Sequence, residues 1–575
     1  MPLTGNDFIA VPDISDTGAI RSINVLSMRE KGLIELKGDP FITPSIYIDG
    51  KRAGSFSFSY REYWIPEFRF SCEKADAVLT ILTPHGHKGF CMAFSVTSRN
   101  GEKLDAEIRF EVNLSHLVHT VNESKEIEVR KKVRKSSWED DFIIETFIGT
   151  PFLCFAAMGE NASSKTGSDN GFTYVFSNQL TAGGQYSGCL YFGIAFEEVG
   201  AVTVCRELQR WGYDRLLMQS VKYIEEHTVR CEGPAYSELL NRNLLFALHY
   251  SLGITFDSEE LVCITSRSPH YYVSAAYWDR DSLLWSFPAI ARIDISLARR
   301  VLDYVVQRQA RNTGVHSRYI DGSVLEPGFE LDELVSPVIA IDTYIENGGD
   351  RSILEEREVR KLIEKILCGL EKWKDEKTGL YATFLQPTDD MTRYSFLLYD
   401  NALVIKAFRI LATLFSDPSY AHDADVLHEQ CMKYFNVEGE YVWAVDGNGN
   451  YDIYDEPPGS LILLPYYGFC TVDDPVYRKT VERINDASYE YSFSGCPFAA
   501  AGCAHAPHPW VLSLINEFKV FRSPDALDKL LRAPMDEKIA CESIDENTGE
   551  AATGRAFATC AGFLACALME ALDEQ

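Results

Sequence analysis

Residues 541–568 read CESIDENTGEAATGRAFATCAGFLACAL and join a carboxylate, an acidic turn and an apolar helix. Glu542 stands just before DENTG (545–549), a sequence typical of a turn. Small apolar residues then continue to Leu568, which predicts a helix. The same turn would suit an ordinary surface loop in which Glu542 has no chemical role. The other segments of the chain must decide between these two interpretations.

Helical spacing runs through the chain from about Val202 onward. It begins with CRELQRWGYDRLLMQSVKYIEEH, which predicts a linker helix within 202–232. Beyond it, apolar stripes predict about twelve helices, at 235–252, 281–296, 297–312, 334–348, 352–373, 394–415, 422–435, 458–467, 475–486, 509–521, 525–535 and 557–572.

Short and long connections alternate between these helices. The long loops are 253–280, 313–333, 374–393, 436–457, 487–508 and 536–556. Because alternate loops in a ring of helical hairpins emerge at the same end, we expect all six to converge on one mouth and to carry function. A stacked solenoid would also contain many helices, but the sequence has no repeat of fixed period. The pattern favours a closed toroid of six hairpins, an (α/α)6 barrel.

The N-terminal part has a different period. Up to about Ala201 it consists of short alternating runs separated by Gly, Asn, Asp and Lys, such as SIYIDG, GSFSFSYREYW, AVLTILTP, CMAFSVTS, AEIRFEV, FTYVFS and CLYFGIAF. Alternation with turn residues between the runs is typical of an antiparallel sandwich. With 575 residues the chain exceeds one hydrophobic core. We therefore predict a β-sandwich at 1–201, a linker helix at 202–232 and a helical barrel at 233–575.

The charge of the chain excludes some partners. Its formal net charge is −29, from 84 acidic and 55 basic residues, so nucleic acids and anionic membranes are poor partners. The longest basic run, RKKVRK at 130–135, is followed by SSWEDD and is interpreted as a solvated strand and turn.

The cysteines and the N-terminus bear on the compartment. Fifteen cysteines are scattered through apolar segments and are interpreted as reduced core thiols. The chain starts MPLTGNDFIAVPD, without a signal-like apolar core, and no segment is apolar for about 18 residues. We expect a cytoplasmic protein.

The first long loop ends in AAYWDRDSLLWSF (275–287). In this pattern the Asp281 carboxylate can accept hydrogen bonds, the Arg280 guanidinium can donate them, and Trp278 offers an apolar face. Alternatively, Asp281 caps a helix and Arg280 pairs with a neighbouring acid.

Acidic residues also mark the second and third long loops. The second contains GFELDELVSPV, with Glu330, Asp332 and Glu333 at the start of a helix, where they could bind substrate or complement the helix dipole. The third contains QPTDDMTRYSF, in which Asp389 and Asp390 could supply a general acid or cap the next helix.

The fifth long loop holds CPFAAAGCAHAPHPWVLSLINEF (496–518). Trp510 is a candidate pocket residue, although buried core is its other interpretation. His505 lies near Cys496 and Cys503, but the spacing supplies no second half of a tetrahedral site. We therefore expect apolar loop packing around His505, no metal and no other cofactor.

Taken in order, these segments resemble the glucoamylase-type and glycogen-debranching-type glycosidases, which have an (α/α)6 barrel. The resemblance covers the helical half, and a generic sandwich precedes it. It implies that Trp278, Arg280, Asp281, Asp332, Glu333 and Trp510 bind the terminal sugar. It also implies that Glu542 is the general base and that Asp389 or Asp390 is the acid, with Glu333 as an outside candidate. The family pattern of Glu after Trp is missing from the third loop, which leaves the acid and the subfamily open.

The implied reaction is hydrolysis with inversion, in which two carboxyl groups lie roughly 6.5 to 9.5 Å apart with water between them. A pocket closed at one end would make the enzyme exo-acting, and the resemblance points to glucose from α-glucosides at the non-reducing end of short oligosaccharides. An α-mannosidase on the same barrel, a disaccharide phosphorylase and a non-catalytic carbohydrate-binding protein stay open as alternatives. The sequence leaves the linkage preference and the oligomeric state undetermined.

Overall fold

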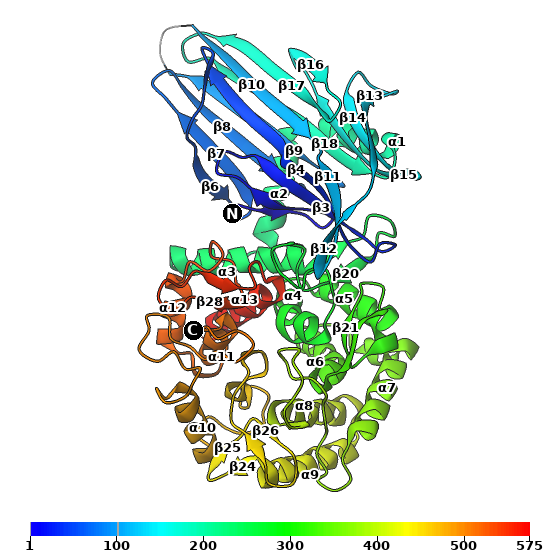
Figure 1. The fold of residues 1–575 in the computed structure, drawn as a ribbon, viewed down its shortest axis with the longest axis vertical. Coiled ribbons are helices and arrows are strands. Elements are labelled where there is room, and N and C mark those ends of the chain that lie inside the picture. Colours follow the sequence, from blue (N-terminus) through cyan, green and yellow to red (C-terminus); the bar gives the residue numbers. More distant parts are fainter. Residues whose placement is uncertain (1, 100–102, 575) are drawn as a thin grey trace. The chain divides into compact units, whose positions relative to one another are not determined.

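The structure, a computed structural model, describes residues 2–99 and 103–574. The chain forms two compact units. Unit one comprises Met1–Thr228, Leu252–Glu260 and Arg267–Pro269, and unit two comprises Val229–Ser251, Leu261–Ser266 and His270–Gln575. The predicted order, an antiparallel sandwich followed by paired helices, is confirmed (Figure 1).

Unit one contains two antiparallel sheets. The first has the order β1 (Thr4–Gly5), β2 (Ile9–Ile14), β3 (Ile20–Ser27), β4 (Gly32–Ile48), β10 (Leu104–Asn113), β17 (Gly171–Leu180) and β16 (Ser164–Gly167), and β5 (Lys51–Arg52), β11 (His116–Val121) and β12 (Glu123–Ile127) branch from it. The second has the order β13 (Arg130–Lys135), β14 (Phe142–Ile148), β15 (Thr150–Gly159), β18 (Gln185–Ala195), β9 (Gly89–Ser98), β8 (Ala75–Leu82), β7 (Ile65–Ser71) and β6 (Ser57–Arg61). The basic run at 130–135 is strand β13, as predicted.

The alternation in the sequence builds the core between these sheets. In β10, for example, every second residue from Leu104 to Val112 is buried, and the residues between them are more exposed. Apolar residues from both sheets form one continuous cluster. Register follows from this pattern, because a shift by one residue would turn the apolar set outward.

The stretch predicted as a linker helix contains two helices. α1 (Glu198–Trp211) and α2 (Tyr213–Glu226) are separated by Gly212, which has a φ of 74°. Ala201, Val202 and Cys205 of α1 pack in a small cluster on residues of β14 and β15. These helices therefore belong to the sandwich unit rather than forming a free linker.

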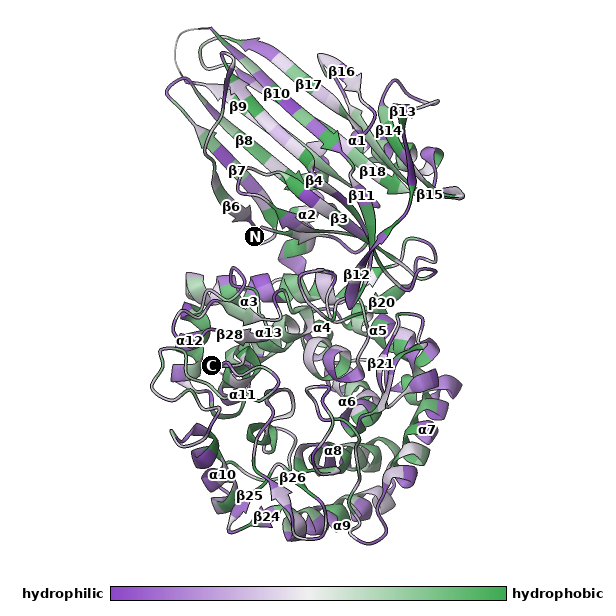
Figure 2. Ribbon diagram, viewed as in Figure 1, coloured by the Kyte–Doolittle hydropathy of each residue, from purple (hydrophilic) through white to green (hydrophobic). Residues whose placement is uncertain are grey.

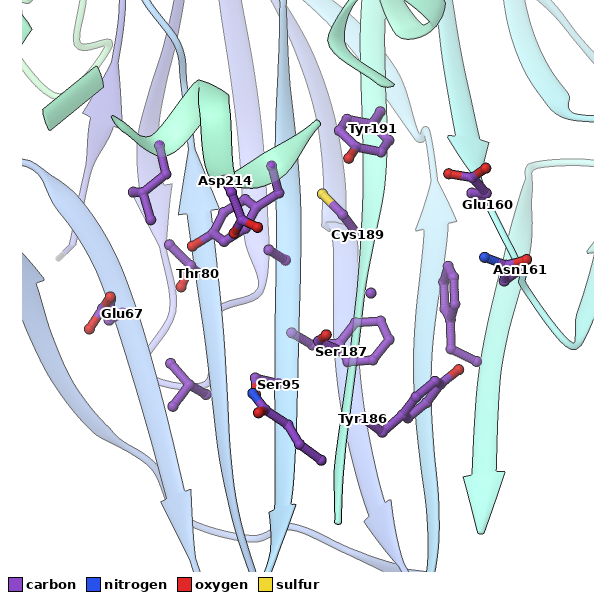
Figure 3. Close-up of a pocket in the computed structure, with 18 of the residues that line it drawn as sticks. Glu67, Thr80, Ser95, Glu160, Asn161, Tyr186, Ser187, Cys189, Tyr191 and Asp214 are labelled. Atoms are coloured by element: carbon purple, nitrogen blue, oxygen red, sulfur yellow. The ribbon is translucent and has the colours of Figure 1, made fainter. Parts of the chain in front are cut away.

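A groove of about 700 Å³ lies in unit one, lined by side chains of β6–β9, β18 and the first turn of α2 (Figure 3). Its polar side chains largely bond one another. Arg61 lies 2.7 Å from the Glu67 carboxylate, and Gln185 donates to Ser95 at 2.9 Å.

Unit two is built from helices. They are α3 (Pro234–Phe246) with the π-helical η1 (Ala247–Ser251), the π-helical η2 (Arg280–Ser286) with α4 (Phe287–Ile293), α5 (Ile295–Gln307), α6 (Leu331–Glu346), α7 (Arg357–Trp373), α8 (Leu398–Phe415), α9 (Pro418–Phe435), α10 (Pro475–Asn485), α11 (Val511–Phe521), α12 (Pro524–Arg532) and α13 (Ala558–Asp573). Short 3₁₀ turns are η3 (Gln309–Asn312), η4 (Arg351–Glu355), η5 (Pro457–Gly459) and η6 (Leu461–Leu463).

Six of these elements close an inner ring. Each touches the next in the order η2 with α4, α6, α8, η6, α11 and α13, and α13 returns to η2 and α4. α6, α8, α11 and α13 are buried along most of their length. α5, α7, α9, α10 and α12 bury one face only, and Figure 2 colours much of α7 and α10 purple. Inner and outer helices thus alternate along the chain, as in a ring of helical hairpins.

One predicted helix is wrong. The stretch 458–467 is a series of 3₁₀ turns, η5 and η6, followed by further turns. Pro457, Pro458 and Pro465 lack the N–H groups that a helix needs, and Gly459 adds flexibility. The apolar stripe correctly indicated burial, because Leu461 to Leu464 are buried.

Two further properties concern the described residues. No helix among them combines the length and the apolar character needed to cross a lipid bilayer. Each cysteine is a free thiol, and most of these thiols are buried.

The small strands of unit two lie in the long loops. They are β20 (Leu261–Cys263), β21 (Val315–Arg318), β22 (Val324–Phe329), β23 (Phe396–Leu397), β24 (Asn436–Val437), β25 (Glu440–Tyr441), β26 (Ala444–Val445), β27 (Tyr451–Asp452), β28 (Ser543–Ile544) and β29 (Ala551–Thr553). β19 (Leu252–Ile254) belongs to unit one. Paired strands give these loops internal hydrogen bonds, so they hold side chains in fixed positions.

Gly562 closes the inner ring where α13 meets η2. A Cβ atom there would lie 2.6 Å from the backbone Cα of Ser286. We predict that Gly562→Ala lowers the thermal unfolding midpoint, because a steric cost of about 1–3 kcal/mol exceeds the helix-propensity gain of about 1 kcal/mol. Gly54→Ala is the control, because nothing lies within 4 Å of its added Cβ. Equal midpoints for Gly562→Ala and the wild type would contradict this packing.

Candidate active site

A cavity lies where the long loops of unit two meet. Four of the six predicted long loops contribute lining residues, together with η2 and with Pro458, Trp510 and Phe557, which follow the fourth, fifth and sixth loops. The full lining is Thr265, Tyr271, Tyr272, Val273, Trp278, Arg280, Asp281, Trp285, Pro387, Thr388, Asp389, Pro458, His505, Trp510, Glu542 and Phe557. The second loop contributes Glu330 and Asp332, which contact Arg280 but do not line the cavity. The expected convergence therefore holds for the first, third, fifth and sixth loops, and the second loop reaches the site only through its contacts with Arg280.

Two backbone hydrogen bonds fix the position of Glu542. Its N–H donates to the Gly554 carbonyl at 3.1 Å, and its carbonyl accepts from the N–H of Val511 at 3.0 Å. Gly554 has a φ of 55°, and a Cβ there would lie 2.5 Å from Glu542 Cβ. The glycine is therefore required for this close approach. Glu542 is 3% exposed and lines the cavity.

A chain of hydrogen bonds leads away from Glu542 across four loops. The Tyr272 hydroxyl donates to Glu542 Oε1 at 2.5 Å and lies 3.2 Å from His505 Nε2. His505 Nδ1 lies 3.0 Å from Asp390 Oδ2. Tyr272 as a residue is 46% exposed, but desolvation around its hydroxyl and the neighbouring Glu542 carboxylate raise its pKa, so the hydroxyl keeps its proton.

The third loop turns sharply at the two aspartates. The Asp389 N–H donates to the Gln386 carbonyl at 2.8 Å, and the Gln386 N–H donates to the Asp390 carbonyl at 2.9 Å. Asp389 has a φ of 68°, a conformation that Asp tolerates better than most residues. The turn sends the two carboxylates in different directions, Asp389 to Arg280 and Asp390 to His505.

Arg280 is the centre of a buried ionic cluster. Its Nη1 donates to Glu330 at 2.8 Å and to Asp332 at 3.0 Å, and its Nη2 donates to Asp389 at 2.8 Å. Its side chain is 2% exposed. The surrounding carboxylates raise its pKa against the opposing effect of burial, so the guanidinium stays charged.

Asp332 and Glu333 lie outside the cavity lining. Asp332 contacts Arg280, and Glu333 accepts from the backbone N–H groups of Asp279 and Arg280. Burial raises the pKa of Glu333 well above its ordinary value. These two acids hold the WDRD segment (278–281) in place instead of facing the cavity. The geometry therefore gives no support to Glu333 as the general acid.

The remaining predicted residues reach the cavity. Trp278, Asp281 and Trp510 are buried and line it. Asp281 Oδ1 accepts from Thr559 on α13 at 2.9 Å, and burial, opposed by Arg280, raises the pKa of Asp281 to about 7. Of the two aspartates in the third loop, Asp389 lines the cavity with a side chain that is 33% exposed. Asp390 is 54% exposed and faces His505.

Two sets of side chains are close enough to hold a metal ion, namely His316, Glu330 and Asp389, and Glu330, Asp332 and Glu333. Arg280 donates to Glu330, Asp332 and Asp389 and supplies the positive charge between them. His316 adds further positive charge. Burial lowers its pKa, but hydrogen bonds and charges from the neighbouring carboxylates have the larger effect and raise it to about 10. We interpret both sets as ion-paired networks.

Sequence reasoning missed three residues of this region. Apolar packing was expected around His505, and that expectation is wrong, because the imidazole lines the cavity and contacts Asp390. Tyr272 lies in the first long loop, only six positions before Trp278, and its position there was the available signal. Glu456 ends the fourth loop, is 5% exposed and accepts from Gln386 at 3.0 Å behind the aspartate turn.

Glu456 gives a prediction about stability. Burial raises its pKa from 4.5 to about 7, so the folded state binds more protons than the unfolded state between these values. Stability is therefore lost as pH rises from about 4.5 to about 7, by an amount on the order of 3 kcal/mol. We predict that Glu456→Gln has a higher thermal unfolding midpoint than the wild type at pH 8, and that the difference closes towards pH 4.5.

The exposed Glu482 on α10 provides the matched control, because Glu482→Gln changes the same atoms without burial. A difference between Glu456→Gln and the wild type that stays constant from pH 4.5 to pH 8 would contradict the assignment.

Comparison with known proteins gives matches of two kinds. The family model described as metal-independent alpha-mannosidase (GH125) matches residues 367–569, which is less than half of the chain. Trehalase 1 of Sulfolobus acidocaldarius is 29% identical over 118 residues, 19% of this chain, and the match spans only 20% of that relative.

Solved structures match over longer stretches. A bacterial glucoamylase complexed with acarbose has a TM-score of 0.67 at 12% identity and covers 100% of this chain and 94% of its own. A putative kojibiose phosphorylase from human microbiome has a TM-score of 0.59 at 12% identity, with coverage of 99% and 86%. A metal-independent alpha-mannosidase of Streptococcus pneumoniae has a TM-score of 0.52 at 21% identity, with coverage of 60% and 95%. At these identities the matches establish the fold: the chain has a β-sandwich and a glucoamylase-like (α/α)6 barrel, and its predicted resemblance to glycoside hydrolases of this fold is confirmed.

Proposed function

We propose that the chain is an exo-acting glycoside hydrolase that removes a terminal α-mannosyl residue with inversion. The observation that carries this proposal is that Glu542 and Asp389, from loops far apart in the sequence, line one cavity together with Arg280 and Asp281. Inverting hydrolysis needs a general base and a general acid facing one sugar from opposite sides.

Glu542 would act as the base. One of its oxygens accepts from Tyr272, which fixes the carboxylate and leaves the second oxygen to accept a proton from water. Asp389 would act as the acid. Its Oδ1 accepts from Arg280, so its second oxygen would carry the proton to the glycosidic oxygen. Its partial exposure supports a position beside the leaving group.

The floor of the cavity would bind the sugar hydroxyls. Arg280 can donate and Asp281 can accept, as charged partners that strengthen hydrogen bonds. The buried Trp278 Nε1 has no hydrogen-bond partner among the described residues. Because a buried, unpaired N–H costs about 1–3 kcal/mol, a substrate oxygen is its natural acceptor.

The open space of the cavity is small, about 30 Å³. We infer that side chains at its rim move when a sugar ring enters, and that the contact between Arg280 and Asp389 is one that a sugar hydroxyl would compete for.

The choice of mannose rests on the family-model match, which spans both Asp389 and Glu542. A terminal α-glucosyl substrate is the second candidate, supported by the trehalase match and the whole-chain likeness to a glucoamylase. Mannose and glucose both suit the same acid and base. They differ in the orientation of one hydroxyl, which Arg280 or Asp281 would recognise by hydrogen bonding.

A substrate panel tests the proposed reaction. We predict release of single mannose units from α-mannobioses, without any requirement for phosphate, and the β anomer as the first product in proton NMR. α-Glucobioses are assayed alongside. Faster release of glucose would favour the second candidate, strict dependence on phosphate would indicate a phosphorylase, and an α anomer appearing first would rule out inversion.

The two neighbouring aspartates provide a matched test of the acid. We predict that Asp389→Asn lowers kcat/KM by about 10²–10⁴-fold on a mannobiose, and much less on an aryl mannoside whose leaving group needs no proton. Asp390→Asn, in the same turn, should keep more activity and should not distinguish the two substrates. The reverse pattern for the two aspartates would assign the acid to Asp390.

The proposed base has its own test. Glu542→Gln should lower turnover by a similar factor on both substrates while binding is kept.

A further inference from the structure

The proposed acid–base pair leaves His505 without a role, although it connects the two sides of the site. His505 comes from the fifth loop, and its ring contacts Asp390 of the third loop and Tyr272 of the first. Its Nε2 also lies 4.0 Å from Glu542 Oε1, on the sixth loop. One imidazole thus touches side chains from three other loops.

We propose that His505, held as a cation by Asp390, is a positioning residue that locks Tyr272 onto Glu542 and keeps the base ionised. The inference rests on the proposed function of Glu542. It assigns His505 no direct contact with the reacting atoms.

The directions of the hydrogen bonds carry the argument. Glu542 as a carboxylate can only accept, so the Tyr272 hydroxyl gives its single proton to it. The Tyr272 oxygen is then an acceptor towards His505 Nε2, and Asp390 is an acceptor towards Nδ1. Only an imidazolium, which has a proton on both nitrogens, donates to both.

A neutral ring would break this arrangement. If Nε2 lost its proton, it would compete with Glu542 for the Tyr272 hydroxyl. If Nδ1 lost its proton, a lone pair would face the Asp390 carboxylate. The fully directed chain therefore exists only in the charged state of His505.

The groups around the ring favour that state. They are Asp390 and Asp389 on the third loop, Glu542 on the sixth, Tyr272 on the first, and the Trp510 ring, whose centroid lies 6.2 Å away. Burial lowers the pKa of His505, but the hydrogen bond to Asp390 and the charges of Glu542 and Asp390 outweigh it, and the net change is upward.

The consequence is a defined change in the pH profile. The base must be ionised, so activity falls as pH drops, and a cation about 4 Å away favours the ionised form. Removing that cation moves the acidic limb of kcat/KM to higher pH. A residue that only supported the fold would lower activity by the same factor at every pH.

The first experiment compares His505→Gln with the wild type on the best substrate. We expect the acidic limb to move up by about one pH unit, the low end of the effect of a close charge. His508→Gln is the control, because His508 lies three positions away and contacts Glu546 outside the cavity. An unmoved acidic limb in His505→Gln, with a uniform loss of kcat, would overturn the proposal.

A second experiment needs no substrate, so its failure is distinct from failure of the proposed function. Imidazole ¹⁵N NMR of the full chain, with His505 assigned by its absence in His505→Gln, gives the titration midpoint of this ring. We expect a midpoint above 6.5 that falls by about one unit in both Asp390→Asn and Glu542→Gln. A midpoint that neither substitution changes would also overturn the proposal.

Discussion

The contact between Arg280 and its three carboxylates organises the candidate active site. A buried guanidinium is tolerated only when it is paired, and Arg280 pairs with two acids of the second loop and with Asp389 of the third. Removing the arginine would leave several carboxylates facing one another in a water-poor space. The first three loops are therefore held at one position by charge, and Asp389 is placed in the cavity by the same interaction.

Glu542, the proposed base, is placed by different means. Glu542 depends on backbone hydrogen bonds to Gly554 and Val511 and on the space that a glycine leaves. Backbone contacts respond little to pH, whereas the ionic cluster around Arg280 responds to every proton gained or lost by its acids. A series of side-chain contacts joins the third loop to Glu542, running from Asp390 through His505 and Tyr272. The ionic contacts of the site are thus concentrated around Arg280, and His505 contacts both Asp390 and Tyr272.

The sequence predicted the architecture because both periods are long and regular. The alternating strands and the apolar helices, including α13, lie where their patterns indicated. The predicted helix at 458–467 was wrong because apolar spacing reports burial, while three prolines decide the backbone. Trp278, Arg280, Asp281, Asp389 and Glu542 were found from local motifs. Tyr272, His505 and Glu456 were not, because their roles come from contacts between loops that are distant in the sequence.

The same reasoning explains why Asp389 and Asp390 could not be separated from the sequence. They are identical residues in one turn, and each would cap a helix or carry a proton equally well. The left-handed conformation of Asp389 turns one carboxylate towards Arg280 and the other towards His505. What differs is therefore the charge that each meets: a permanent guanidinium for Asp389 and a titratable imidazole for Asp390. A site built in this way has one aspartate whose partner never changes charge and one whose partner can.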